Sequence, residues 1–197
     1  MVSHLQDKEY KNISAIVLSG GRSSRMGTDK CELEYEGQTL INYQIGKIKR
    51  IGIEDIIASG YRGKMCDAKI VADDIMKGPL SGLLKGLMAI KNDRAFVISV
   101  DVPLVKIESI KKIIDYSFEK DFDITMLRHR DSREPLIAVY KKNLIDTIRV
   151  LLNGDNYSMM RLADMVSCGF VDLDDEDRFY LNVNNKEDYN KLLENNI

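Results

Sequence analysis

Short apolar runs alternate with amphipathic stretches along most of the chain. Ile13–Ser19 is an apolar run that leads into two glycines, which is typical of a buried strand. Leu40–Ile51 instead spaces its apolar residues three and four apart and stops at Gly52, which predicts a helix. Pro79–Ile90, with a proline near its start, predicts another helix. The pattern predicts further strands over Asp55–Ser59, Lys69–Ala72, Ala95–Val100, Asp123–Arg128, Leu136–Tyr140 and Cys168–Leu173, and further helices over Ile107–Phe118, Lys142–Leu152, Ser158–Met165 and Lys186–Glu194.

The order of these elements indicates the fold class. Strands that alternate with helices predict an α/β protein, a three-layer α/β/α sandwich around a mostly parallel sheet. The late strand pair, which flanks a polar turn at His129–Glu134, predicts an antiparallel portion and therefore a mixed sheet. A chain of 197 residues fits one domain over 1–197. The polar residues 1–12 are expected to form a flexible N-terminal extension.

Composition narrows the class of protein. The chain is 44% hydrophobic and 30% charged, as expected of a globular protein. It contains no apolar run near the roughly 18–20 residues of a membrane span, and no signal-peptide pattern at the start, so we expect a cytoplasmic protein without a membrane partner. The net charge of −2 argues against a general nucleic-acid binder. Three cysteines lie far apart without metal-binding spacing and are expected to be free thiols: Cys31, Cys66 and Cys168.

The loop after the first strand carries the strongest chemical signal. Ligands of open α/β sheets bind beyond the carboxyl ends of the strands, where this loop begins. Gly20 and Gly21 remove two side chains, so that backbone N–H groups can face a phosphate closely. Cations suited to triphosphate oxygens follow at Arg22, Arg25 and Lys30. The loop is neither a Walker loop nor a GxGxxG motif, and on composition alone it could be a glycine turn with solvated charges.

The loop L-x-G-G-x-S-x-R-M-G-x-D-K resembles the signature of the molybdenum cofactor guanylyltransferase family. The matching residues are Leu18, Gly20, Gly21, Ser23, Arg25, Met26, Gly27, Asp29 and Lys30. Ser19 stands where that family usually has alanine, a small-for-small change. Further pieces follow in the family's order at Gly78–Gly82, Asp101–Pro103, Pro135–Leu136 and Asn182–Asn184, so the resemblance spans about Ile13 to Tyr189.

This resemblance implies a Rossmann-like nucleotide-diphospho-sugar transferase fold and a set of site residues. It implies catalytic roles for Arg25, Lys30 and Asp101. It implies nucleotide binding by Leu18, Ser19, Gly20, Gly21, Lys30, Ser59, Asp74, Gly78, Pro79, Leu80, Gly82 and Asp101. Whether Asp73 or Asp74 is the site residue stays open, and helix–sheet packing is an alternative role for the glycines Gly82 and Gly86.

Asp101 directly follows a predicted buried strand, which is a suitable place for a metal ligand. Magnesium prefers one or two carboxylates together with phosphate oxygens and waters, so Mg²⁺ is the expected cofactor. The alternative is that Asp101 caps the next helix. Val102–Leu104 departs from the family's usual Met or Thr, Pro, Phe at packing positions, but the carboxylate is retained.

Asn182 and Asn184 lie on one side of an extended segment, where they could contact the acceptor or the water shell of the metal. Alternatively, Asn184 and Asn185 cap the last helix. The two histidines, His4 and His129, have no spacing that indicates a catalytic triad or a zinc site.

The resemblance implies transfer of GMP from GTP to molybdenum-bound molybdopterin, with release of pyrophosphate. GTP and the molybdopterin acceptor are the implied partners, together with proteins of molybdoenzyme maturation. A CTP-dependent cytidylyltransferase or a nucleotide-sugar-forming enzyme is the nearest alternative, although by the same resemblance Gly20–Gly21 and Gly78–Leu80 favour GTP. A non-catalytic nucleotide-binding adaptor on the same fold is an alternative of another class.

Overall fold

A seven-stranded sheet forms the centre of the protein in the computed structural model, which describes residues 10–20, 29–155, 157–172 and 182–194. Its strands, in spatial order, are β5 (Lys69–Val71), β4 (Ile56–Ser59), β1 (Ser14–Leu18), β6 (Arg94–Ser99), β8 (Ser132–Lys141), β7 (Ile124–His129) and β9 (Cys168–Asp172). A separate two-stranded hairpin comprises β2 (Glu34–Tyr35) and β3 (Gln38–Thr39). The helices are α1 (Leu40–Arg50), α2 (Gly78–Ala89), α3 (Ile107–Lys120), α4 (Ile145–Asn153), α5 (Met159–Ala163) and α6 (Lys186–Glu194), with 3₁₀ turns η1 (Lys30–Glu32) and η2 (Lys142–Leu144).

Strand direction places most strand ends at one edge of the sheet. β1 runs parallel to β4 and β6, and β4 runs parallel to β5. β8 is antiparallel to both of its neighbours, β6 and β7, and β7 is parallel to β9. The carboxyl ends of all strands except β8 therefore meet at the same edge. The predicted mixed, mostly parallel sheet is confirmed.

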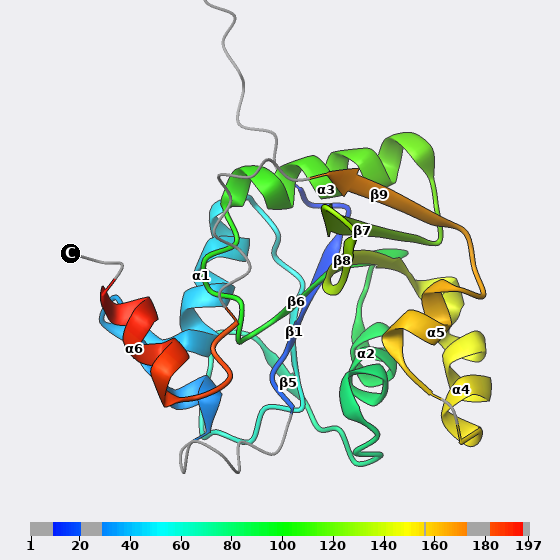
Figure 1. Ribbon diagram of the computed structural model, residues 1–197. Coiled ribbons are helices and arrows are strands. Elements are labelled where there is room, and N and C mark those ends of the chain that lie inside the picture. The colour runs from blue at the N-terminus through cyan, green and yellow to red at the C-terminus, as the bar shows by residue number, and fades with distance from the viewer. Residues whose placement is uncertain (1–9, 21–28, 156, 173–181, 195–197) are drawn as a thin grey trace, which may run out of the picture.

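Helices cover both faces of this sheet (Figure 1), with α1 and α3 on one side, joined there by α6, and α2, α4 and α5 on the other. Alternate residues of β1 divide between the two cores: Ala15 and Val17 belong to the first, and Ile16 and Leu18 to the second. Gly86 allows α2 to approach closely, because a Cβ there would lie 2.7 Å from Cγ2 of Ile16. Helix–sheet packing thus accounts for this glycine.

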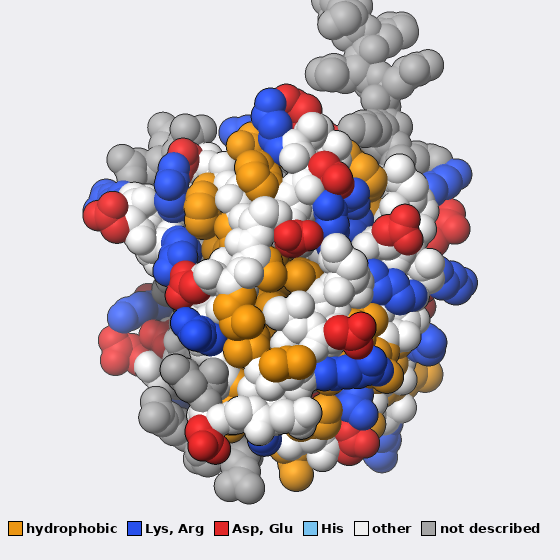
Figure 2. All heavy atoms as spheres, turned by 90° about the vertical axis from the view of Figure 1, so that its right-hand side faces the viewer, with side chains coloured by type: hydrophobic (Ala, Val, Ile, Leu, Met, Phe, Trp, Pro, Cys, Tyr) orange, Lys and Arg blue, Asp and Glu red, His pale blue; other side chains and the backbone are white. Residues whose placement is uncertain are grey.

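The face formed by α2, α4 and α5 mixes charges of both signs with apolar side chains (Figure 2). The exposed apolar residues include Met88 on α2, Val150 on α4 and Met165 after α5. Within the described ranges, no helix is long and apolar enough to cross a membrane.

Several element boundaries differ from the sequence-based expectation. β8 begins at Ser132, so the polar turn predicted over His129–Glu134 shortens to Arg130 and Asp131, with Arg130 in the left-handed region at φ 53°. Residues 132–134 are polar because this part of the hairpin is solvent-exposed or half-buried. The apolar pattern also missed the short β2–β3 hairpin and η1. At the other end, Tyr10 is only 2% exposed, so core packing begins before Ile13.

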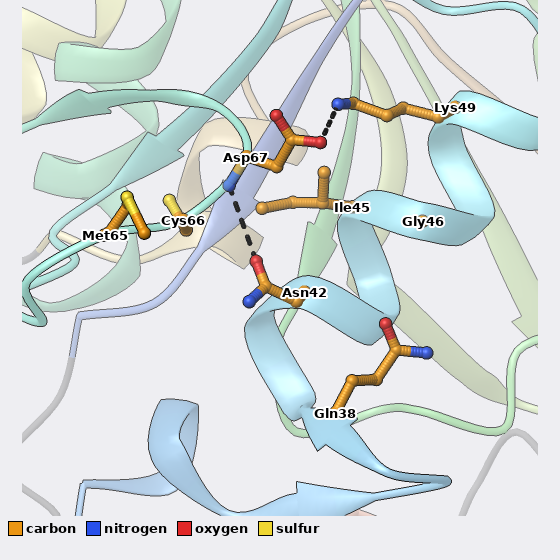
Figure 3. Close-up of a pocket in the computed structure, with 8 residues that line it drawn as sticks. All are labelled: Gln38, Asn42, Ile45, Gly46, Lys49, Met65, Cys66 and Asp67. Carbon is orange, nitrogen blue, oxygen red and sulfur yellow. Dashed lines mark hydrogen bonds and ion pairs between the residues drawn. The ribbon is translucent and has the colours of Figure 1, made fainter.

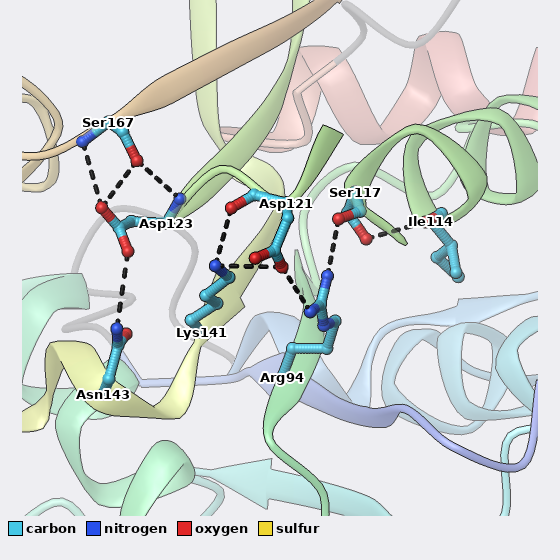
Figure 4. Close-up of polar contacts among 8 residues, drawn as sticks. All are labelled: Arg94, Ile114, Ser117, Asp121, Asp123, Lys141, Asn143 and Ser167. Atoms are coloured by element: carbon cyan, nitrogen blue, oxygen red, sulfur yellow. Dashed lines mark hydrogen bonds and ion pairs between the residues drawn. The ribbon is translucent and has the colours of Figure 1, made fainter. Parts of the chain in front are cut away.

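The edge of the sheet where the parallel strands begin is closed by polar contacts (Figure 4). Asp121 ends α3 in the left-handed conformation, and its carboxylate accepts contacts from Arg94 Nη2 at 2.8 Å and from Lys141 Nζ at 3.0 Å. These contacts, that of Lys141 first, lower the pKa of Asp121. The pKa of Asp123 is also lowered, mainly because Ser167 Oγ donates a hydrogen bond of 2.6 Å to it.

Candidate active site

Three polar side chains from distant parts of the sequence meet at the carboxyl edge of the sheet. Nζ of Lys30 lies 3.5 Å from Oδ2 of Asp101 and donates a hydrogen bond of 2.9 Å to Oδ1 of Asn184. The side chains of Lys30 and Asp101 are 20% and 22% exposed, so both remain accessible to a ligand. The structure therefore brings together Lys30, Asp101 and Asn184, which were predicted as site residues from three separate motifs of the sequence.

The position of Lys30 follows from its neighbours on η1. Asp29 caps this turn, because its Oδ1 accepts a hydrogen bond of 3.1 Å from the backbone N–H of Cys31. Cys31 is fully buried, and its thiol donates to the carbonyl oxygen of Ser19 at 3.4 Å. Burial is also the main reason that the pKa of Cys31 is raised. Cys31 thus fixes η1 against the end of β1, while Lys30 beside it reaches outward.

The side chain of Asn184 contacts Lys30, whereas that of its neighbour Asn185 caps α6. Oδ1 of Asn185 accepts from the backbone N–H of Asp188 at 3.0 Å, which is the capping contact, whereas the side chain of Asn184 contacts Lys30. Between the two sequence-predicted amides, the backbone N–H of Val183 donates a 2.9 Å hydrogen bond to the carbonyl of Asp101. Asn182 is exposed at the start of the same segment.

A cavity of about 480 Å³ opens at the same edge of the sheet, over the ends of β1, β4 and β5. Its walls are Gly20, Gly60, Arg62, Asp73, Ile75, Met76 and Gly78. Gly60 has φ +79°, and a Cβ there would lie 2.9 Å from Cα of Gly20, so the two loops can approach this closely because residue 60 is a glycine. A cavity of this volume suits a nucleoside.

Asp73 and Asp74 have different surroundings. Oδ1 of Asp73 accepts from the backbone N–H groups of Ile75 and Met76 at 3.2 and 3.1 Å, and its Oδ2 accepts from Ser81 Oγ at 2.6 Å. Asp73 therefore shapes the loop that walls the cavity. Asp74 is exposed and pairs with Lys85 at 2.6 Å, a contact that lowers the pKa of Asp74. It is not among the cavity-lining residues.

Other residues implied by the resemblance make buried contacts among β1, β4 and α2. Ser19 Oγ donates to the carbonyl of Ser59 at 2.9 Å, and Ser59 Oγ donates to the carbonyl of Gly82 at 2.7 Å. A Cβ on Gly82 would lie 3.2 Å from Cδ2 of Leu18, so this glycine fits α2 against β1. These buried contacts lock β1, β4 and α2 together. Leu80 is 1% exposed in the core, and Pro79 lies in the first turn of α2.

Two residues of the expected site, Gly21 and Arg25, lie outside the described residues. Sequence reasoning missed Gly60, Arg62, Ile75 and Met76. The signal for Gly60 and Arg62 was present, because both lie within three residues of the end of β4, which ends at the same edge as β1.

The donor set at this edge can be compared with the needs of a metal ion. Among the described residues, no group of three or more His, Cys, Asp or Glu side chains could enclose a metal. Of the described side chains that meet here, Asp101 contributes a carboxylate and Asn184 an amide oxygen, both of which contact Lys30. This set fits Mg²⁺ or a similar hard ion that receives its remaining ligands from phosphate and water.

A second cavity, of about 430 Å³, lies on the outer side of α1 (Figure 3). Lys49 forms an ion pair with Asp67 across it, and the backbone N–H of Asp67 donates to Oδ1 of Asn42 at 3.4 Å. Among the residues that the structure describes, it shares no lining residue with the first cavity. The described catalytic candidates, Lys30 and Asp101, lie at the carboxyl edge of the sheet and not at this second cavity.

A mixed α/β sheet with a lysine, a strand-end carboxylate and a nucleoside-sized cavity at its carboxyl edge defines a nucleotidyltransferase. Residues 15–167 match the family described as the MobA-like NTP transferase domain, and the chain belongs to this family. Enzymes of this kind generally use a divalent metal ion.

Relatives and solved structures agree with this assignment. The chain is 32% identical over 190 residues to a probable molybdenum cofactor guanylyltransferase of Peptoclostridium acidaminophilum, covering 89% of this chain and 86% of the relative. It is 28% identical over 188 residues to the molybdenum cofactor guanylyltransferase of Campylobacter jejuni (strain RM1221), covering 93% and 97%. The crystal structure of molybdopterin-guanine dinucleotide biosynthesis protein A from Archaeoglobus fulgidus superposes with a TM-score of 0.76 at 20% identity, over 92% of this chain and 97% of that one. The last comparison supports the fold alone.

Proposed function

We propose that this protein transfers GMP from GTP to molybdenum-bound molybdopterin and releases pyrophosphate. The observation that carries the proposal is the meeting of Lys30, Asp101 and Asn184 at the edge of the sheet that also carries the glycine-walled cavity, in a chain whose relatives are named molybdenum cofactor guanylyltransferases. In this proposal the guanosine occupies the cavity and the triphosphate extends toward Lys30.

The chemistry requires positioning and charge neutralisation more than proton transfer. The acceptor attacks through a phosphate oxygen that is already ionised, so no side chain has to remove a proton from it. The bond between the α-phosphorus and the bridging oxygen to the β-phosphate breaks, and that oxygen leaves with pyrophosphate. Lys30 is placed to neutralise triphosphate charge. Asp101, together with Asn184, would hold Mg²⁺, which would act as a Lewis acid on the phosphate oxygens when bound.

Asp73, which lines the cavity, is proposed as the functional member of the Asp73–Asp74 pair. Replacing Asp73 with Asn should weaken GTP binding about tenfold, because the loop that walls the cavity loses charge-assisted hydrogen bonds. Asp74→Asn is the matched control and should change GTP affinity less than about twofold, since an exposed ion pair contributes little. Equal effects of the two variants on calorimetric titrations would remove Asp73 from the site.

Arg62 is proposed to read the guanine base. It is the one cationic side chain among the described residues that line the cavity, and its Nη2 lies 3.5 Å from Sδ of Met76. An arginine fork matches O6 and N7 of guanine, which cytosine does not present together.

The decisive experiment supplies molybdenum cofactor, Mg²⁺ and either GTP or CTP, and measures pyrophosphate and the dinucleotide product. Product with GTP supports the proposal, whereas product only with CTP supports the cytidylyltransferase alternative. Nucleotide binding without any product would favour a non-catalytic adaptor. We also propose a cytoplasmic location, which the free thiols Cys31, Cys66 and Cys168 support.

A further inference from the structure

Helix α1 carries two polar side chains on its buried face. Gln44 is fully buried and Lys47 is 4% exposed. Both point at one segment, residues 99–105, which leaves β6 and contains Asp101. Neither residue belongs to the motifs that the resemblance rests on.

The two side chains bind backbone carbonyls on both sides of Asp101. Nε2 of Gln44 donates hydrogen bonds of 3.0 Å to the carbonyls of Ser99 and Val102. Nζ of Lys47 donates to the carbonyls of Pro103 and Val105 at 2.7 and 3.0 Å. Four carbonyls within seven residues are thus held by one helix face.

The Asp101 backbone is fixed from other directions as well. The N–H of Val183 donates to the carbonyl of Asp101, and the N–H of Val100 donates to the carbonyl of Leu18 at 3.0 Å. The carboxylate of Asp101 is left to face Lys30. The segment around Asp101 is therefore held by its main chain, while its side chain stays available.

Stability alone is a weak reason for these two residue types. A buried ammonium is expensive, and burial lowers the pKa of Lys47 to about 7, with Arg50 adding to the effect. The hydrogen bonding of the Gln44 amide is also incomplete, because its Oε1 has no hydrogen-bond partner in the described part of the chain. Apolar side chains of similar size could fill the same volume, but they could not bind the four carbonyls.

We propose that Gln44 and Lys47 are positioning residues that hold the segment 99–105 so that Asp101 presents its carboxylate beside Lys30 and Asn184. This inference rests on the proposed function for its effect on catalysis. Its structural part, the restraint of residues 99–105, is independent of that function.

The test compares Lys47→Met and Gln44→Met, which keep the length of the side chains but remove the donors. Lys49→Met is the matched control, because Lys49 lies on the same helix and pairs with Asp67 away from the site. Gln44→Met keeps the test possible if Lys47→Met does not fold. The first readout is amide hydrogen exchange of peptides covering residues 99–105.

Amide exchange in residues 99–105 should be faster in Lys47→Met and Gln44→Met, the two clamp variants, and unchanged in Lys49→Met. The transfer rate kcat should fall about 10- to 100-fold, as expected for a displaced catalytic group, while KM for GTP changes less than about threefold. The tightening of GTP binding by Mg²⁺, titrated without the acceptor, should shrink in the clamp variants while affinity without Mg²⁺ is retained.

Unchanged exchange over residues 99–105, or the same loss of kcat in Lys49→Met, would overturn the positioning role. Equal losses of GTP affinity with and without Mg²⁺ would also overturn it, because that result describes a general structural defect. If the wild-type protein transfers nothing, the proposed function fails, and exchange still decides the positioning role.

Discussion

At the edge where the parallel strands end, Lys30 lies 3.5 Å from Asp101, whereas at the opposite edge Arg94 and Lys141 reach Asp121 at 2.8 and 3.0 Å. Both edges thus pair cations with carboxylates that follow secondary-structure elements. At the opposite edge the cations also bind main-chain carbonyls, with Arg94 Nη1 donating to Ser117 at 2.6 Å and Lys141 Nζ to Asp121 at 2.7 Å.

The difference shows how similar side chains acquire different uses. Short contacts to several acceptors tie α3, β6 and β8 together at the opposite edge (Figure 4). At the carboxyl edge the Lys30–Asp101 contact is longer, and the same edge carries a cavity, so a bound phosphate or metal ion could replace that contact with shorter ones. The first arrangement stabilises the fold, and the second is suited to a ligand. Substitutions at each edge should therefore affect different properties.

The largest expected effect is that of Asp101→Asn. We expect kcat to fall at least about 100-fold, because the substitution removes the carboxylate that would hold the metal, and metal stabilisation of phosphate charge contributes several kcal/mol. Thermal unfolding should change little, since the hydrogen bond from Val183 is made to the backbone of Asp101. Asp121→Asn is the control at the opposite edge and should retain kcat. Normal turnover in Asp101→Asn, with Mg²⁺ still required, would reject the role of Asp101.

Lys30→Ala comes next. A charge-assisted contact to triphosphate is worth roughly 1.5–3 kcal/mol, so kcat/KM for GTP should fall about 10- to 100-fold. Lys141→Ala, at the opposite edge, should lower the melting temperature and leave kcat/KM unchanged. Steady-state kinetics and thermal melts of both variants provide the comparison. If Lys30→Ala keeps both GTP affinity and rate, Lys30 is only a surface charge.

Much of this contrast could be predicted from the sequence, because strand ends are visible in the apolar pattern. The runs before Gly20 and Asp101 are mostly apolar and contain Ile and Val, so their carboxyl ends could be placed at one edge, with Asp101 directly after its strand and Lys30 in the loop that follows Gly20. The mixed sheet followed from the late strand pair in the same way. These features depend on local sequence and on a topological rule.

The remaining features depend on tertiary contacts. The distinction between Asp73 and Asp74 needs the position of Ser81 on α2, eight residues later. The amide Gln44 has the spacing of a core position on α1, and Lys47 is an ordinary helix residue until the segment 99–105 packs against them. Strands β2 and β3 have two residues each, which is too short for an alternation of apolar and polar residues to be recognised.

Base choice tests whether the cavity at the carboxyl edge is a specific guanosine site. GTP should bind at least about tenfold more tightly than CTP, a difference of about 1.4 kcal/mol. Gly20→Ala should weaken GTP more than CTP, because the methyl group intrudes on the larger nucleotide. The fold itself should tolerate this change, since a Cβ on Gly20 would lie 3.7 Å from Cα of Gly60.

Arg62→Ala should reduce the preference for GTP over CTP, while Arg149→Ala, which removes an exposed arginine paired with Asp146 on α4, should leave it unchanged. Calorimetric titration of both nucleotides measures each effect. Equal affinities of the wild-type protein for GTP and CTP would contradict the guanosine assignment.

The smallest effect is expected for Asp123→Asn at the edge opposite the site. The variant weakens the contacts of Asp123 with Ser167 and Asn143, so the melting temperature at pH 7 should fall by no more than about 2–4 °C, with kcat unchanged. Hydrogen bonding lowers the pKa of Asp123 below the ordinary value of 3.8, so its stabilising contribution is present above that pH and is lost as pH falls through the lower, folded-state pKa. Denaturant titrations at pH 7, 5 and 3 should therefore show a constant gap between wild type and variant at the first two values and a smaller gap at the third. A gap that does not narrow at pH 3 would mean that packing, and not the ionised carboxylate, stabilises this edge, and a fall in kcat would mean that the two edges are not functionally separate.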